Sequence, residues 1–151
     1  MSAYRTVVVG TDGSQSSLRA VRQAGALAGA CEARLLVVCA FLPSRAEGRE
    51  VRRARGAPGD DAEAAGATPA EDTVRAAAEQ ARAAGASDVV PFAVVGSPVE
   101  TLLDVVAREE ADLLVVGNRG VDGIRGRLLG SVPADVTRRS PVDVLVVHTT
   151  G

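Results

Sequence analysis

The first apolar run of the chain is Thr6-Val7-Val8-Val9-Gly10, followed directly by Thr11-Asp12-Gly13-Ser14. Three consecutive valines bounded by a glycine are typical of a strand that is buried on both faces, as in parallel sheets. The Asp-Gly pair predicts a tight turn, and Ser14 is a suitable N-cap for a helix over residues 14–30. A buried strand that leads through a short turn into a helix is the first half of a βαβ unit.

The same alternation continues to the end of the chain. Further apolar, β-branched runs are expected to form strands at Leu35–Phe41, Val89–Val95, Leu113–Gly117 and Val142–Val147. Strands that alternate with helices favour a parallel sheet with right-handed crossovers. We therefore predict an α/β fold of the Rossmann-like type, with an open five-stranded parallel sheet in the order 3-2-1-4-5 and helices on both faces.

Three further helix starts support this prediction. Thr68-Pro69-Ala70-Glu71 and Ser97-Pro98-Val99-Glu100 each have the spacing of a capping box with proline in the first turn. A last helix is expected to begin at Ser131 and to end near Ser140. Residues 43–67 interrupt the alternation and are interpreted as a flexible insertion, either simply solvated or acting as a lid or partner-binding loop.

Length and composition favour one domain over residues 1–151 and exclude several classes of protein. The net charge is −2, so no general basic field favours nucleic acid or an anionic membrane as a partner. No apolar run approaches the roughly 20 residues that span a bilayer, and no signal-peptide pattern is present, which predicts a cytoplasmic protein. Cys31 and Cys39 fit no metal or redox motif and are expected to be small buried hydrophobic residues.

Two turns that follow strands contain the residues that stand out, namely Gly10–Ser14 and Gly117–Gly120. In open parallel sheets, ligands bind beyond the carboxyl ends of the strands, where the direction of winding reverses. In the predicted order, strands one and four are neighbours at this reversal. The two turns should therefore face each other across one crevice.

The second turn begins the spacing Gly117-x2-Gly120-x9-Gly130-Ser131. The first two glycines allow main-chain amides to approach a ligand closely. The last glycine and the serine precede a helix, whose free amides and dipole attract an anion, and Arg119, Arg125 and Arg127 add positive charge. We interpret this region as a phosphate site, although a glycine-rich connection that only turns the chain has the same pattern.

These motifs, together with Val95-Gly96-Ser97-Pro98, resemble the nucleotide-binding branch of the universal stress protein family over nearly the whole chain. The resemblance implies ATP or another adenine nucleotide in the crevice, with Mg²⁺ left open as an accompanying ion, and usually a homodimer. The turns and the resemblance together give the candidate nucleotide-binding residues, which are Gly10, Thr11, Asp12, Cys39, Val116, Gly117, Arg119, Gly120, Gly130, Ser131, Val132 and Pro133.

The resemblance also implies how these residues divide the nucleotide. Asp12 would bond near the ribose and adenine, and the main chain of Cys39 would contact adenine. Val116 and Gly117 would line the ribose. The residues expected at the phosphates are Gly120, Gly130, Ser131 and Val132. Pro133 stands where many relatives have Ser or Thr, and Cys39 often aligns with Val.

Four functions remain to be distinguished. The first is a nucleotide-binding regulatory or stress-response protein, and the second is a slow ATPase or nucleotidyl transferase that uses the same crevice. A P-loop NTPase is excluded because all 17 basic residues are Arg. The third function, a phosphoacceptor signalling domain, would need an acidic cluster after the first strand and a Lys late in the chain, and this sequence has neither. The fourth, a scaffold that binds no nucleotide, would not need the glycines. His148 is the only histidine, so no metal site or catalytic residue is predicted.

The last predicted strand suggests how two copies would associate. Val144-Leu145-Val146-Val147 is apolar on both faces, yet the predicted strand order places it at an edge of the sheet. An uncovered apolar edge favours pairing with another chain. We therefore expect a homodimer through residues 142–147, in which two equivalent edges pair about a twofold axis.

Overall fold

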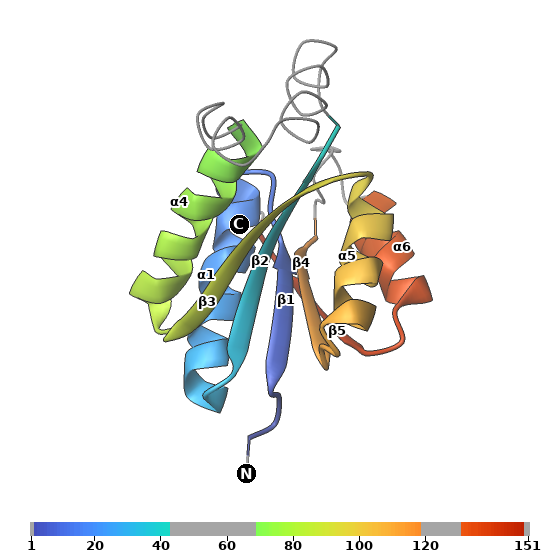
Figure 1. Cartoon of the computed structure of the whole chain (residues 1–151). Coiled ribbons are helices and arrows are strands. Elements are labelled where there is room, and N and C mark those ends of the chain that lie inside the picture. The colour runs from blue at the N-terminus through green and yellow to red at the C-terminus, as the bar shows by residue number, and fades with distance from the viewer. Residues whose placement is uncertain (1, 43–68, 119–130, 150–151) are drawn as a thin grey trace, which may run out of the picture.

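The computed structural model describes residues 2–42, 69–118 and 131–149 (Figure 1). Strands and helices alternate in the predicted order. The strands are β1 (Thr6–Gly10), β2 (Arg34–Phe41), β3 (Asp88–Val95), β4 (Leu113–Gly117) and β5 (Asp143–Val147). The helices in the described ranges are α1 (Gln15–Cys31), α4 (Pro69–Ala84), α5 (Pro98–Arg108) and α6 (Ser131–Arg139).

The five strands form one parallel sheet in the order β3-β2-β1-β4-β5, which confirms the predicted topology. The register places Val9 of β1 between Val37 of β2 and Val115 of β4. The three valines of β1 are 0% exposed. The valine run near the amino terminus is thus the centre of the sheet, as a strand buried on both faces requires.

Helix starts agree only in part with the expected capping. Ser14 caps α1, because its hydroxyl oxygen accepts a hydrogen bond from the amide of Ser17 at 3.1 Å. The capping box predicted at Ser97 is wrong: Ser97 precedes α5, but its side chain caps no amide. Glu100 instead forms an ion pair with Arg139 at 2.7 Å, since a guanidinium is a stronger partner for a carboxylate than a neutral amide. The expectations for Thr68 and for residues 43–67 lie outside the described residues.

The helices form two layers, with α1 and α4 on one face of the sheet and α5 and α6 on the other (Figure 1). In the first layer the two helix backbones touch. A β-carbon added at Gly25 would lie 2.5 Å from the carbonyl oxygen of Ala81, and one at Gly29 would lie 2.4 Å from that of Gly85. Glycine is required at both positions because a side chain would overlap the neighbouring backbone.

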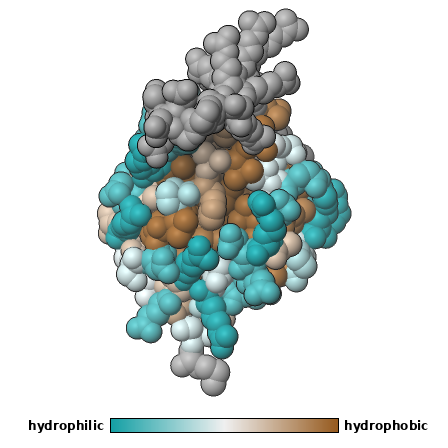
Figure 2. Space-filling view, viewed as in Figure 1, coloured by the Kyte–Doolittle hydropathy of each residue, from teal (hydrophilic) through white to brown (hydrophobic). Residues whose placement is uncertain are grey.

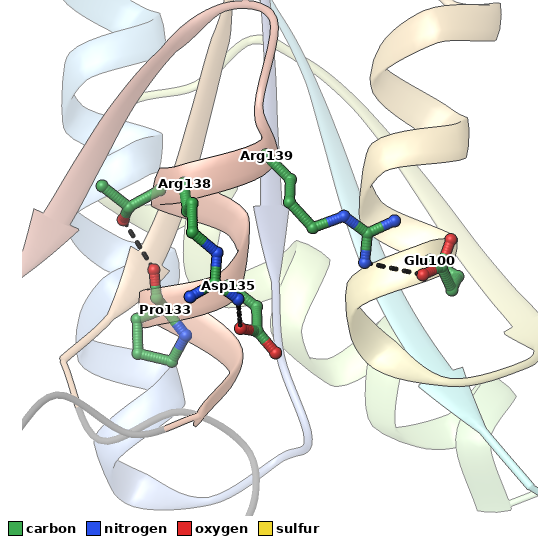
Figure 3. A network of polar contacts seen from close by, with 6 residues as sticks. Glu100, Pro133, Asp135, Arg138 and Arg139 are labelled. Carbon is green, nitrogen blue, oxygen red and sulfur yellow. Dashed lines mark hydrogen bonds and ion pairs between the residues drawn. The ribbon is translucent and has the colours of Figure 1, made fainter.

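The second layer is held by larger side chains and by charge. Leu102 and Val106 of α5 pack with Val136 of α6 against the sheet, and Val136 is 0% exposed. The pair between Glu100 and Arg139 joins the two helices at the surface (Figure 3). This layer places the start of α6 next to the carboxyl end of β4.

The sheet edge formed by β3 is apolar and partly uncovered. Figure 2 shows apolar side chains in the middle of this face, flanked by hydrophilic ones. Val95 at the end of β3 is 41% exposed, and Leu42 just beyond β2 is 76% exposed. Pro91 lies within β3 and has no amide hydrogen to offer to a further strand.

Candidate functional site

A cleft opens at the carboxyl ends of β1 and β4, where the two unusual turns were predicted to meet. It contains about 320 Å³ of empty space, part of which is open to solvent. The residues that line it are Gly10, Ser16, Ser17, Leu102, Val116, Gly117 and Val132. They come from both sheet faces, because β1 and β4 are neighbours and the helices on either side begin beside their ends. The structure therefore brings Gly10, Val116, Gly117 and Val132 of the candidate set together.

The turn between β1 and α1 satisfies its own main-chain amides. Each of its four amides, from residue 11 to residue 14, donates a hydrogen bond within the protein. The acceptors are the carbonyl oxygen of Val38 for Thr11, the Ser17 hydroxyl for Asp12, the Thr11 hydroxyl for Gly13 and the Asp12 carboxylate for Ser14, at 2.9–3.3 Å. A phosphate-binding turn needs such amides to point at the ligand. This turn therefore offers none of them to an anion.

The hydroxyl groups behind this turn are also used internally. Ser17 donates to the carbonyl oxygen of Ser14 at 3.0 Å, so the 2.8 Å bond between Thr11 and Ser17 must have Thr11 as its donor. Thr11 and Ser17 are 2% and 7% exposed. The two hydroxyls thus fix the shape of the turn, and Thr11 is not among the residues that line the cleft.

Asp12 is the exposed acceptor of this turn. One of its carboxylate oxygens accepts the Ser14 amide at 2.9 Å, which orients the side chain. Burial, and to a lesser extent the negative charge of Asp12, raises the pKa of the Cys39 thiol. Cys39 is 6% exposed and packs in the core on the α1 and α4 side of the sheet, outside the lining of the cleft. Its expected contact with adenine could involve only the main chain at the end of β2.

The opposite wall is formed by the end of β4, against which the residues that follow β5 are bonded. The amide of Asn118 donates to the carbonyl oxygen of Val147 at 2.9 Å. The side-chain oxygen of Asn118 accepts two hydrogen bonds from Thr149, one from the amide and one from the hydroxyl, both at 2.8 Å. Thr149 is 5% exposed and also contacts the hydroxyl of Ser16 at the start of α1. The two turns are therefore joined through a residue near the carboxyl terminus.

Of the predicted phosphate site, only the part from Ser131 onward and Gly117 lie within the described residues. Helix α6 begins at Ser131, as expected, and its first turn places Val132 in the cleft wall and buries Pro133. The carbonyl oxygen of Pro133 accepts a hydrogen bond from Thr137 at 2.6 Å (Figure 3). Arg119, Gly120 and Gly130 lie outside the described residues, so their predicted contacts with phosphate stay predictions.

Four residues at the site were missed by reasoning from the sequence. Ser16, Ser17 and Leu102 line the cleft, and Thr149 lies beside two of the lining residues, Ser16 and Gly117. Leu102 follows the predicted helix pattern and could have been found by asking which apolar positions of α5 face the strand ends. Thr149 had no signal in the sequence, because the strand order does not show how the residues beyond β5 pack against the turn after β4.

The described residues contain neither a cluster of metal ligands nor a membrane-spanning helix. Within residues 2–42, 69–118 and 131–149, no group of three or more His, Cys, Asp or Glu side chains could hold a metal ion. Of the helices in the same ranges, none is both long and apolar enough to cross a membrane. The site that the described residues do form is the cleft between β1 and β4.

Comparison with known proteins identifies relatives over almost the whole chain. The model of the universal stress protein family matches residues 3–148. Universal stress protein Rv1636 of Mycobacterium tuberculosis is 49% identical over 150 residues, which are 99% of this chain and 100% of that protein. A crystal structure of a universal stress protein in complex with cAMP is 47% identical, with a TM-score of 0.75 and coverage of 99% and 100% of the two chains.

A more distant structure supports the fold alone. Universal stress protein UspA from Lactobacillus plantarum matches with a TM-score of 0.73 at 23% identity, over 97% of this chain and 99% of that one. Its agreement confirms the arrangement of strands and helices.

Proposed function

The chain belongs to the universal stress protein family, and we propose that it binds an adenine nucleotide across the carboxyl ends of β1 and β4, with ATP as the expected ligand. The nucleoside would lie against the turn between β1 and α1, and the phosphates would extend toward the start of α6. The bound nucleotide would act as a signal that regulates a partner protein in the cytoplasm.

The observation that carries this proposal is the division of hydrogen-bonding groups between the two sides of the cleft. On the β1 side all four turn amides are already used, so the exposed carboxylate of Asp12 leaves that side rich in acceptors. Ribose hydroxyls and the adenine amino group are donors and suit such a surface. Near α6, the helix start and its dipole favour the negative phosphates.

A cyclic nucleotide is the second candidate ligand. The relative of known structure that is 47% identical was crystallised in complex with cAMP. A ligand with a single phosphate needs fewer contacts near α6 than ATP does. The two ligands share the nucleoside, so the β1 side of the cleft would serve both.

Identification of the ligand is the first test. The chain has no Trp and one Tyr, so a nucleotide that remains bound through purification would dominate the ultraviolet spectrum. Mass spectrometry of the released ligand would then separate ATP, AMP and cAMP. Titration calorimetry of nucleotide-free protein with each of the three completes the test, and the absence of binding by all of them would refute the proposal.

Asp12→Ala tests the orientation of the nucleotide. The loss of a charged acceptor should weaken binding about tenfold to hundredfold, corresponding to roughly 1.5–3 kcal/mol. Because the contact is to the nucleoside, the affinities for ATP and AMP should fall by similar factors. Asp88→Ala removes an exposed carboxylate at the start of β3 and should leave both affinities unchanged. A selective loss of ATP binding in Asp12→Ala would show that the orientation is reversed.

We further propose that two copies pair through β5, which stands at the edge of the sheet. Its residues are apolar, and all but Asp143 are half-buried in the single chain. Light scattering should show a dimer at micromolar concentration, and Val146→Lys should convert it to a monomer. A parent protein that is monomeric at this concentration would contradict this part of the proposal.

A further inference from the structure

Thr149 is a buried polar residue whose bonds reach both walls of the cleft. It follows β5 by two residues, is 5% exposed and packs beside Gly117, where an added β-carbon would lie 3.2 Å from its methyl group. Its carbonyl oxygen accepts a hydrogen bond from Arg19 of α1 at 3.1 Å. Its hydroxyl lies 2.8 Å from the side-chain oxygen of Asn118 and 2.5 Å from the hydroxyl of Ser16.

The donor and the acceptor of each of these hydrogen bonds follow from the chemistry of the two partners. The amide of Thr149 can only donate, so the Asn118 atom that it contacts at 2.8 Å must be the oxygen. That oxygen can only accept, so the hydroxyl of Thr149 donates to it. A hydroxyl has one hydrogen, and the contact between Ser16 and Thr149 must therefore have Ser16 as its donor.

This assignment determines what Ser16 offers to a ligand. Its hydroxyl hydrogen points to Thr149, and its side chain lines the cleft. Only lone pairs of its oxygen are therefore available to a bound molecule. A group that donates a hydrogen bond is recognised there, whereas a phosphate oxygen finds no donor.

We propose that Ser16 accepts a hydrogen bond from a ribose hydroxyl of the bound nucleotide, and that Thr149 is the positioning residue that holds the Ser16 hydrogen away from the ligand. This inference rests on the proposed function, in which the ribose lies near Val116 and Gly117. Those two residues share the cleft lining with Ser16. The site would thus distinguish ribose from its deoxy forms by a residue at the start of α1.

The test compares ATP with 2′-deoxy-ATP and 3′-deoxy-ATP by titration calorimetry. The parent protein should bind at least one deoxy analogue about fivefold more weakly than ATP, as expected for one neutral hydrogen bond of about 1 kcal/mol. In Ser16→Ala, ATP should bind about fivefold more weakly and that analogue should be unaffected, so the preference disappears. A general structural defect would weaken all three ligands equally and would overturn the inference.

Two substitutions at residue 149 test the positioning role. Thr149→Ser keeps the hydroxyl and should retain the full preference for ribose. Thr149→Val keeps the shape but releases the Ser16 hydroxyl, and the preference should fall to about half of the parent value or less. If Thr149→Val does not fold, the Ser16→Ala result alone decides whether Ser16 is the acceptor.

Two outcomes separate this inference from the proposed function. A parent protein that binds none of the three ligands would refute the proposed function, and the inference with it. A parent protein that binds ATP and both analogues equally, or a Ser16→Ala variant that keeps the parent preference, would overturn the inference alone.

Discussion

On one face of the sheet, α1 and α4 approach until backbone meets backbone, whereas on the other face α5 and α6 meet through side chains. The first contact is made at Gly25 and Gly29, where no β-carbon fits. The second depends on the core around Val136 and on the surface pair between Glu100 and Arg139 (Figure 3). Both layers contribute to the cleft, since α1 follows the β1 turn and α6 begins beside β4.

The difference means that the helices on the two faces of the sheet are free to shift to different extents. Backbone contacts leave no room for a shift of α1 against α4, because packed interiors yield little to added volume. Long side chains can change rotamer, so α6 can adjust to a ligand at its start with less strain. The β1 turn is thus held in shape by the protein's own hydrogen bonds.

The strongest test of this comparison is Gly25→Ala. Helix propensity alone would make this change stabilising by about 1 kcal/mol. We expect instead a net loss of about 2 kcal/mol in the free energy of unfolding, because the new β-carbon overlaps the carbonyl group of Ala81. Chemical denaturation measures the change, and equal or higher stability would show that the two helices are not in backbone contact.

The thiol of Cys39 reports on the same face. It is 6% exposed, and burial raises its pKa, so less reactive thiolate is present at any given pH. Cys39 should react with a thiol reagent at pH 8 at least about tenfold more slowly than a small-molecule thiol, which corresponds to about 1.4 kcal/mol. Gly25→Ala should accelerate the reaction. Equally fast labelling of Cys39 in the folded parent would contradict tight packing of this face.

A matched pair of valines compares the two faces directly. Val21 of α1 and Val136 of α6 are both 0% exposed. Val21→Ala should destabilise the protein by about 2.5 kcal/mol and Val136→Ala by about 1.5 kcal/mol, since the side-chain layer can relax into the cavity more fully. The difference of about 1 kcal/mol is measured by urea unfolding, and the reverse order would refute the assignment of the tighter face.

The smallest effect is expected for Glu100→Gln at the surface of the second layer. Hydrogen bonding to Arg139, with its positive charge, lowers the pKa of Glu100. A carboxyl whose pKa is lowered on folding stabilises the protein above its unfolded pKa, and this contribution is lost as the pH falls through the folded pKa. Both side chains are exposed, so we expect only a slight decrease in Tm at pH 7.

The pH and salt dependence provide the control for that prediction. The difference in Tm between Glu100→Gln and the parent should vanish in 1 M salt and at a pH below the folded pKa of Glu100. A large loss of stability at pH 7 would mean that the ion pair, rather than the apolar core around Val136, holds α6 in place.

Most of the architecture could be predicted because it depends on local pattern. The valine run of β1 and the alternation of strands and helices predicted a parallel sheet, and the observed strand ends differ from the predicted ones by at most one residue. The predicted capping box at Ser97 failed because the partner of Glu100 lies on another helix. A local pattern cannot reveal that a residue remote in sequence will bind the Glu100 carboxylate in place of the capping amide.

The candidate site was predicted less completely than the fold. The facing turns of β1 and β4 followed from strand order, and the first residue of each turn, Gly10 and Gly117, does line one cleft. No motif predicted that the turn amides are used internally or on which side of the sheet Cys39 packs. Nor did any motif predict the link through Thr149. Each of these depends on which atoms meet when distant segments pack together.

The sequence by itself determined the parallel sheet and a crevice at its strand ends, because hydrophobic period and turn chemistry act over a few residues. Its glycine spacing carried the resemblance to the family. Only the tertiary structure decided which groups at the crevice remain available to a ligand. Hydrogen bonds are made once for each hydrogen, so the bond from Ser16 to Thr149 determines what Ser16 can offer. That bond joins residues that are 133 positions apart in the chain, and it forms only when β5 pairs with β4.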